Sequence, residues 1–269
     1  MTAPPQRPRR RLGQHFLIDQ NIVRKIVAEA ALRPDETVLE IGPGRGVLTR
    51  ALCQEARLVI AVELDPGLHD TLRESMTDSR NLDLRRGDAL EFPYESLRPA
   101  TVVVSNLPYN VSTPVLFKLF DARDRIDRMV LMVQNEVAQR LIAKPGGRDY
   151  GILSVLTQYW TEPSLAFRVS PTCFRPRPAV SSAVVTLMMR KHPALPVRDE
   201  ASFVKTVRAA FAHRRKTVAN SLRDEGLTAD AVSSALRYTG IEPSRRAETL
   251  SLPEFAALAD ALATTDLSW

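Results

Sequence analysis

The fold class of this sequence is decided by Val38-Leu39-Glu40-Ile41-Gly42-Pro43-Gly44-Arg45-Gly46. In this stretch an apolar, β-rich run passes into a glycine-rich turn, and the turn leads into a helical pattern. Glycine has no Cβ, so glycines such as Gly42 and Gly44 let the backbone approach a nucleoside closely. The motif by itself is weakly specific, because dinucleotide-binding enzymes and purely structural turns share it. It predicts an α/β fold with a ligand site where this strand ends.

β-rich runs and helical patterns alternate on both sides of the turn. This alternation predicts βαβ units and a mostly parallel sheet with helices on both faces. Two later β-rich runs, 165–169 and 183–189, have no long helix between them and are expected to pair at an antiparallel edge. A helix near residues 22–30 has Asp19 as its expected N-cap. The other predicted helices cover residues 47–55, 67–76, 114–120 and 135–143, and the other predicted strands cover 37–41, 58–63, 82–86, 101–106 and 128–134.

A domain boundary is expected near Pro193 and Pro196, which lie in a polar stretch. The chain of 269 residues is long enough for one domain of ordinary size and a smaller second one. We expect a basic arm at 1–11, an α/β domain at 12–192 and a small C-terminal all-α domain at 193–269. The helices of this last domain are expected at residues 203–222, 229–237 and 253–262.

The composition is typical of a globular protein, because 44% of the residues are hydrophobic and 25% are charged. No apolar run approaches the roughly 20 residues that a membrane span requires, and none follows the arginines of the arm as in a secretory signal. We therefore expect a cytoplasmic protein that does not bind membranes. Cys53 and Cys173 are far apart and the four histidines lack metal-ligand spacing, so neither a disulfide framework nor a metal site is expected.

The net charge of +6 is concentrated in two places. Basic side chains grouped in this way replace counterions along a phosphate backbone and so favour binding of a nucleic acid. A solvated helix face with a disordered tail is the alternative, and the charge alone leaves both interpretations open. The arm carries Arg7, Arg9, Arg10 and Arg11 without an acid, and residues 201–223 carry Lys205, Arg208, Arg214, Arg215, Lys216 and Arg223 without a carboxylate.

Acidic residues lie at the ends of the next two predicted strands. Glu63 ends the second strand, where a carboxylate accepts hydrogen bonds from both hydroxyls of a ribose. Its neighbour Asp65 is expected to cap the following helix. Asp88 ends the third strand, where it either accepts a hydrogen bond from an adenine amino group or caps a turn. A glycine turn, a ribose acid and an adenine acid on three successive strands favour an adenosyl ligand.

The fourth strand ends at Asn106, and Leu107-Pro108-Tyr109 follow it. The reaction of a dehydrogenase does not require this sequence at that position. The lone pair of an adenine amino group is delocalised, and two acceptors, the Asn106 side-chain oxygen and the Leu107 carbonyl, would make the nitrogen more pyramidal by binding its hydrogens. Pro108 restricts Leu107 to an extended conformation. Tyr109 offers a ring to stack on an extruded base, worth about 1–3 kcal/mol. A simple turn is the alternative, although its place at a strand end favours a ligand site.

This chemistry requires no general base when the methyl donor is a sulfonium, because the donor is already activated and positioning supplies most of the catalysis. The sequence accordingly offers no catalytic histidine or cysteine pattern. S-adenosylmethionine is therefore favoured over NAD as the cofactor, and the fold is expected to be the Rossmann-like sheet of a class I S-adenosylmethionine methyltransferase.

Three further segments resemble the small-subunit ribosomal RNA adenine dimethyltransferase family, and the resemblance covers nearly the whole chain. They are Leu12-Gly13-Gln14-His15-Phe16-Leu17, residues 174–182 and Ala210-Phe211-Ala212-His213-Arg214-Arg215-Lys216-Thr217-Val218-Ala219-Asn220-Ser221-Leu222. The family often has Asn at the place of His15 and usually Gln at that of His213. The resemblance implies that Phe174 stacks on the adenine opposite Tyr109, although without the family Phe174 would be interpreted as core. It also implies a cofactor site made of His15, Leu17, Gly42, Gly44, Glu63, Asp88 and Asn106.

The resemblance implies dimethylation of the N6 amino groups of two adjacent adenosines in a hairpin near the 3′ end of 16S rRNA. The enzyme would act as a monomer on an assembling small ribosomal subunit, with Arg10, Arg11, Arg214, Arg215 and Lys216 at RNA phosphates. Enzymes that methylate large-subunit RNA share the Asn-Leu-Pro-Tyr-like motif but are not similar over residues 210–222. A different RNA or DNA adenine methyltransferase, a protein-glutamine methyltransferase and a non-catalytic ribosome-binding factor remain the alternatives.

Overall fold

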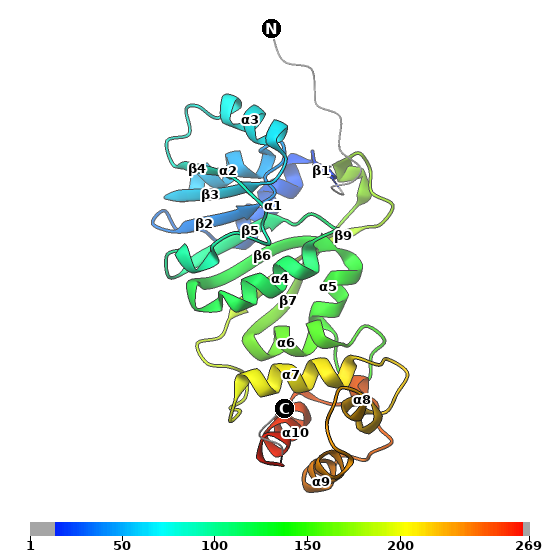
Figure 1. Ribbon diagram of the computed structural model, residues 1–269. Coiled ribbons are helices and arrows are strands. Elements are labelled where there is room, and N and C mark those ends of the chain that lie inside the picture. The colour runs from blue at the N-terminus through cyan, green and yellow to red at the C-terminus, as the bar shows by residue number, and fades with distance from the viewer. Residues whose placement is uncertain (1–13, 266–269) are drawn as a thin grey trace. The chain divides into compact units, whose positions relative to one another are not determined.

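The computed structural model describes residues 14–265 (Figure 1), and the expected arm at 1–11, with Arg10 and Arg11, lies outside these residues. The chain forms two compact units, which are described separately. One unit contains the residues up to Ala138 together with Pro163–Met189. The other contains Gln139–Glu162 together with the residues from Arg190 onward.

A seven-stranded sheet is the centre of the first unit, with the strand order β4-β3-β2-β5-β6-β9-β7. The strands from β4 to β6 in this order run parallel to their neighbours, and β9 is antiparallel to β6. The chain order reverses at β2, which has β3 on one side and β5 on the other, and open α/β sheets bind ligands at such a point. The strands are β2 (Thr37–Ile41), β3 (Leu58–Glu63), β4 (Leu82–Arg86), β5 (Thr101–Asn106), β6 (Ile126–Gln134), β7 (Thr161–Val169) and β9 (Ser182–Met189).

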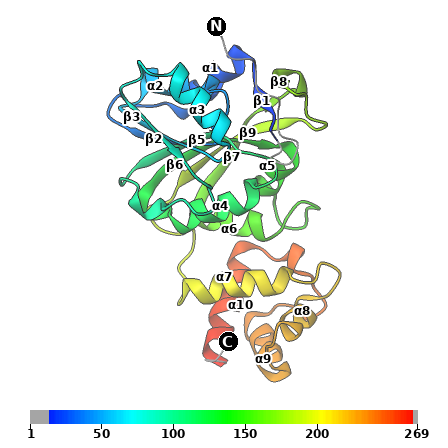
Figure 2. The same ribbon diagram turned by 45° about the horizontal axis from the view of Figure 1, so that its top comes forward.

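The helices between these strands form where the sequence predicts them. Asp19 accepts hydrogen bonds from the backbone N–H groups of Asn21 and Ile22 and so caps α1, and Asp65 caps α3 in the same way. Figure 2 shows α1 and α4 on opposite sides of the sheet, so the expected Rossmann-like fold class is confirmed. The helices are α1 (Gln20–Ala30), α2 (Val47–Glu55), α3 (Pro66–Ser75), α4 (Ser112–Asp121) and α5 (Asn135–Ile142).

A second, two-stranded sheet joins segments that are far apart in the sequence. It consists of β1 (Phe16–Leu17) and β8 (Phe174–Arg175), which pair antiparallel with Leu17 opposite Phe174. Strands of two residues show no measurable period, so the sequence pattern did not predict them. The pairing matters for the site because it fixes the segment before α1 beside the loop that precedes β9.

The second unit is helical, and it takes in more of the chain than the expected domain at 193–269. Helix α6 (Ile152–Trp160) belongs to it, since the ring of Tyr159 lies 4.4 Å from that of Phe203, measured between centroids. Most side chains of α6 are buried, so this helix needs apolar partners on several faces. The remaining helices are α7 (Glu200–Phe211), α8 (Val218–Asp224), α9 (Ala229–Thr239) and α10 (Leu252–Thr265).

The prediction of one helix over residues 203–222 was wrong. Helix α7 ends at Phe211 and α8 begins at Val218, with a turn between them. Thr217 explains the break, because its side chain accepts a hydrogen bond from the Asn220 backbone N–H and caps α8. The expected RNA-binding residues Arg214, Arg215 and Lys216 therefore lie in an exposed turn and not on a helix.

No helix within residues 14–265 is long and apolar enough to cross a membrane. The same residues contain no group of three His, Cys, Asp or Glu side chains that is suited to hold a metal ion. Cys53 and Cys173 both have free thiols.

Candidate active site

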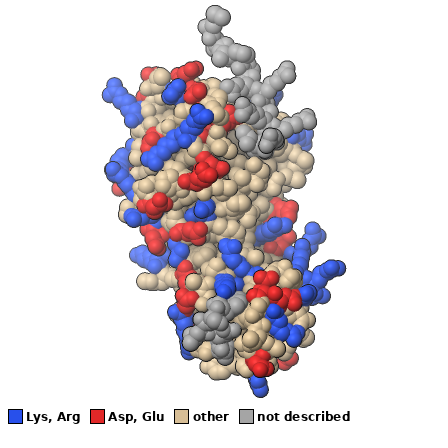
Figure 3. Space-filling view, in the orientation of Figure 1, with Lys and Arg blue, Asp and Glu red and all other residues tan. Residues whose placement is uncertain are grey.

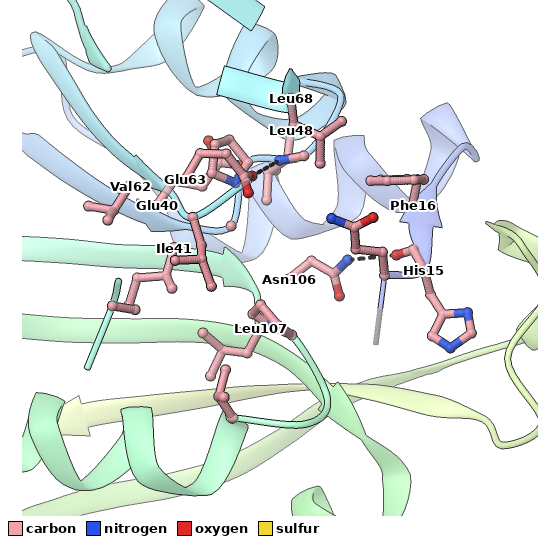
Figure 4. Close-up of a pocket in the computed structure, with 18 of the residues that line it drawn as sticks. His15, Phe16, Glu40, Ile41, Leu48, Val62, Glu63, Leu68, Asn106 and Leu107 are labelled. Atoms are coloured by element: carbon pink, nitrogen blue, oxygen red, sulfur yellow. Dashed lines mark hydrogen bonds between the residues drawn. The ribbon is translucent and has the colours of Figure 1, made fainter. Parts of the chain in front are cut away.

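A pocket opens where β2, β3 and β5 end, and its empty space is about 1070 Å³ including the open mouth. Figure 4 shows side chains from these strands and from the segment around β1 directed into it. A space of this size suits a nucleoside-sized ligand. Of the residues that the sequence predicts for the site, those lining the pocket are His15, Leu17, Gly42, Gly44, Glu63, Asp88, Asn106, Leu107, Pro108 and Tyr109.

The glycine turn forms one wall of the pocket with bare backbone. Gly42 and Gly44 have φ angles of +69° and +58°, in the left-handed region that favours glycine. A Cβ on Gly42 would lie 3.1 Å from Cγ of Pro108, and one on Gly44 would lie 3.1 Å from the ring of Phe16. Because glycine has no side chain, a ligand can lie directly against the backbone at both positions.

Glu63 ends β3 with both carboxylate oxygens hydrogen-bonded to backbone. Its Oε2 accepts from the Gly44 N–H at 3.0 Å, and its Oε1 accepts from the Asp65 N–H at 2.9 Å. Burial raises the pKa of the Glu63 carboxyl, and these backbone donors act in the opposite direction. Each oxygen keeps a second lone pair, so the carboxylate can still accept hydrogen bonds from the hydroxyls of a ribose.

Asp88 caps a turn, which is one of the two roles that the sequence left open. Its Oδ1 accepts a hydrogen bond of 2.8 Å from the Leu90 backbone N–H, which is the turn-capping role. Its other oxygen has no hydrogen bond within residues 14–265, and the residue lines the pocket. Capping therefore fixes the carboxylate and leaves one oxygen for a ligand.

Asn106 ends β5 and carries the strongest chemical signal in the pocket. Its Nδ2 donates a hydrogen bond of 3.4 Å to the His15 carbonyl, as Figure 4 shows. Its Oδ1 is buried and has no hydrogen-bond partner within the described part of the chain. Buried polar atoms are nearly always paired, so this acceptor in the pocket is open to a donor group from a ligand. The N–H of the neighbouring Leu107 donates to the Met132 carbonyl at 3.0 Å and fixes the turn against β6.

Comparison with known proteins identifies the family. The sequence model described as ribosomal RNA adenine dimethylase matches residues 6–264. The chain belongs to the ribosomal RNA adenine dimethylase family. A relative in Moorella thermoacetica is 46% identical over 95% of this chain and 92% of its own length, and one in Pelotomaculum thermopropionicum is 47% identical over 94% and 90%. Both are named ribosomal RNA small subunit methyltransferase A.

Solved structures agree with this membership. A dimethyladenosine transferase from Plasmodium falciparum is 25% identical with a TM-score of 0.76, over 91% of this chain and 96% of that one. The 23S rRNA methyltransferase ErmE is 28% identical with a TM-score of 0.68, over 92% and 99%. The expected family and enzyme class are confirmed, and so is the cofactor class, because members of this dimethylase family use S-adenosylmethionine.

Phe174, which the family resemblance placed opposite Tyr109, is not among the residues that line the pocket. It is 2% exposed and lies in the hydrophobic core with Leu17 and Val169. The β1–β8 pairing explains this position, because Leu17 and Phe174 face each other across the two strands. The structure thus agrees with the interpretation of Phe174 as core, and in this conformation its ring is not available to a base.

Not all of the basic side chains that were predicted to bind RNA are unpaired. Arg214 and Arg215 are exposed and form no ion pair with any described residue, whereas Lys216 pairs with Asp224. Lys216 in turn lowers the pKa of the Asp224 carboxyl through this hydrogen bond. Figure 3 shows basic and acidic side chains interspersed over the visible face.

Phe16, Glu40 and Leu64 also line the pocket, although sequence analysis assigned them no role in the site. Phe16 carries the guanidinium of Arg45 above its ring, 4.6 Å from the centroid. Glu40 is 2% exposed, and burial, with repulsion from Glu63, raises its pKa to about 8. Leu64 is 48% exposed and follows Glu63 at the pocket edge. An acid within an apolar strand was a visible signal for Glu40, whereas Phe16 and Leu64 have no distinctive pattern.

Proposed function

We propose that this chain dimethylates the N6 amino groups of two adjacent adenosines in a hairpin near the 3′ end of 16S rRNA. The observation that carries the proposal is the unpaired Oδ1 of Asn106, a buried acceptor at the end of β5 beside the glycine turn. An adenine amino group supplies the donor that this oxygen lacks. Two relatives named for the small ribosomal subunit, at 46% and 47% identity over nearly the whole chain, support the choice of RNA.

The residues of the pocket fit S-adenosylmethionine. The left-handed glycines at Gly42 and Gly44 leave room for its methionine part, and Glu63 offers lone pairs to its ribose. The uncapped oxygen of Asp88 offers an acceptor to its adenine, and His15 and Leu17 lie at the wall of the pocket. When bound, S-adenosylmethionine supplies an activated methyl group on a sulfonium.

The chain itself contributes orientation of the target nitrogen. Oδ1 of Asn106 and the carbonyl of Leu107 accept the two amino hydrogens, so the nitrogen becomes more pyramidal and its lone pair is available. Pro108 keeps Leu107 extended and packs against Gly42, which joins the two ends of the pocket. Tyr109 stacks on the base. Burial raises the pKa of its hydroxyl, so it remains a neutral phenol that positions the base and does not take a proton.

RNA recognition is proposed to depend on phosphates and shape. Arg214 and Arg215 can reach a phosphate backbone without first breaking an ion pair, whereas Lys216 must leave Asp224. Arg10 and Arg11 are proposed to contribute from the arm. The target adenosine is extruded from its stack before it reaches Asn106. We further propose that the enzyme is a cytoplasmic monomer that acts on an assembling small subunit.

Mass spectrometry of RNA from small-subunit particles that lack the modification tests the proposal. The particles are incubated with the purified chain and methyl-labelled S-adenosylmethionine, and the RNA is digested and sequenced by mass. We expect dimethyladenosine at two neighbouring positions near the 3′ end of 16S rRNA. Label in another RNA, with none at these positions, would overturn the choice of substrate, and no label in any RNA would overturn the activity.

Methylation of large-subunit RNA is the second candidate. The likeness to the 23S rRNA methyltransferase ErmE favours it, since it extends over 92% of this chain. The higher identity to the small-subunit relatives places it second. A parallel incubation with 23S rRNA decides between the two, because only one of the two RNAs is expected to carry dimethyladenosine.

A further inference from the structure

Ser182 is the first residue of β9 and is fully buried. Its hydroxyl contacts Tyr109, which lines the pocket. The Ser182 Oγ and the Tyr109 hydroxyl share a hydrogen bond of 2.5 Å. In the β6–β9 ladder Ser182 pairs with Gln134, so its backbone is fixed by the central sheet. The Tyr109 hydroxyl is therefore hydrogen-bonded to a residue of the central sheet.

His15 contacts the same ring from another segment. The centroids of the His15 and Tyr109 rings are 5.4 Å apart with an angle of 34° between the planes. Nδ1 of His15 donates a hydrogen bond of 2.9 Å to the Pro176 carbonyl, which fixes the imidazole. Tyr109 is thus contacted at its hydroxyl by the first residue of β9 and at its ring by the segment before β1.

These contacts matter because stacking depends on the place and tilt of the ring. The side chain of Tyr109 rotates about two bonds, and a buried tyrosine hydroxyl normally has a partner. A ring that is fixed before the base arrives loses little entropy on binding and holds the base at the angle needed for reaction. The Ser182 hydroxyl supplies this restraint without any contact with the reacting atoms.

We propose that Ser182 is a positioning residue that acts through the Tyr109 hydroxyl, with His15 as a second support for the ring. The proposal rests on the proposed function, because it assigns Tyr109 to the target adenine. It predicts that Ser182 affects the rate of methyl transfer and not the affinity for S-adenosylmethionine.

Three variants test this inference: Ser182→Ala, Tyr109→Phe and the double variant. Each is assayed for kcat and KM on small-subunit particles, for S-adenosylmethionine affinity by calorimetry and for Tm. Loss of one neutral hydrogen bond predicts a kcat about fivefold lower for Ser182→Ala. Tyr109→Phe keeps the ring and removes the hydroxyl, so it should give a similar loss. The double variant should be no worse than Tyr109→Phe alone, because both changes remove the same interaction.

A spectroscopic signal separates positioning from a structural role. A particle with 2-aminopurine at the target position reports stacking, because its fluorescence is quenched by a neighbouring ring. Ser182→Ala should leave this base less quenched than the wild-type enzyme does. Ser154→Ala is the matched control, since Ser154 is also fully buried and its hydroxyl donates to the Arg140 carbonyl. This control should lower Tm without changing kcat or fluorescence.

The outcomes distinguish the inference from the function on which it rests. An active wild type with unchanged kcat and fluorescence in Ser182→Ala overturns the inference and leaves the proposed function intact. Additive losses in the double variant also overturn it, because Ser182 would then act by another route. A wild type that transfers no methyl group overturns both.

Discussion

Two neighbouring turns build the pocket by opposite means. The glycine turn after β2 contributes bare backbone, with three left-handed glycines and only tight space for a Cβ at Gly42 and Gly44. The Asn-Leu-Pro-Tyr turn after β5 contributes functional groups, above all the unpaired oxygen of Asn106. The glycine turn offers its backbone to the ligand, whereas the Asn-Leu-Pro-Tyr turn offers side chains. Substitutions in the glycine turn should therefore change the shape of the pocket, and substitutions in the second turn should lower the reaction rate.

The two turns also touch, which limits the comparison. Pro108 lies against Gly42, and β2 and β5 are paired in parallel, so both turns leave the sheet at the same edge. A substitution that moves the backbone of one turn should therefore disturb the other turn as well. A substitution that only removes a side-chain atom should leave the other turn unchanged.

The largest effect is expected at Asn106. Asn106→Ala removes the acceptor without adding bulk, so kcat should fall by about 100-fold or more, the loss typical of removing a preorganised polar group. The affinity for S-adenosylmethionine should change only modestly, because Glu63, Asp88 and the glycine turn still line the pocket. Single-turnover kinetics and calorimetry measure the two quantities. Asn21→Ala, at an exposed position of α1, is the control, and a variant as fast as the wild type would remove Asn106 from the mechanism.

Gly46→Ala should be the most damaging change in the glycine turn. Its Cβ would lie 2.2 Å from a methyl carbon of the buried Leu72, and φ is +73°. Left-handed strain alone lowers the free energy of unfolding by about 1–3 kcal/mol, and the clash adds to this loss. Chemical denaturation measures it. Gly151→Ala is the control, because φ is −170° and no atom lies within 4 Å of its Cβ. Equal losses in both variants would contradict the steric explanation.

The basic turn at residues 212–217 differs from both turns of the pocket, because it is expected to act only through its charge. Replacing Arg214 and Arg215 by Ala should weaken binding to small-subunit particles and flatten the plot of log affinity against log salt by about 0.7–0.9 for each phosphate that is no longer neutralised. Lys216→Ala is the matched control and should change the slope less, because Lys216 is paired with Asp224. Binding titrations at several salt concentrations give these slopes. Equal slopes in all three proteins would exclude this turn from the RNA interface.

The effect expected at Glu40, inside β2, appears only when the pH is changed. Burial, with repulsion from Glu63, raises the pKa of its carboxyl to about 8 from the usual 4.5. A raised pKa favours the folded state at low pH, and this contribution is lost as the pH rises through about 8. Glu40→Gln does not titrate, so its Tm relative to that of the wild type should rise between pH 5 and pH 9. Glu55→Gln, at an exposed position of α2, should show no such rise.

The sequence by itself determined the sheet and most of the pocket. The bounds predicted for β2, β3, β4 and β5 agree with the structure, because a glycine, an acid or an asparagine at the pocket edge marks the end of each strand. Asp19 and Asp65 were recognisable as helix caps for the same local reason. Such signals lie within a few residues of the feature that they predict.

Only the tertiary structure decided what depends on distant contacts. It placed Phe174 in the core opposite Leu17 and brought Ser182 to Tyr109. It also assigned α6 to the helical unit and showed the turn that interrupts the predicted helix at 203–222. These features arise from side chains that meet across many residues of chain, and the free energy of such packing is not encoded in any local period or motif.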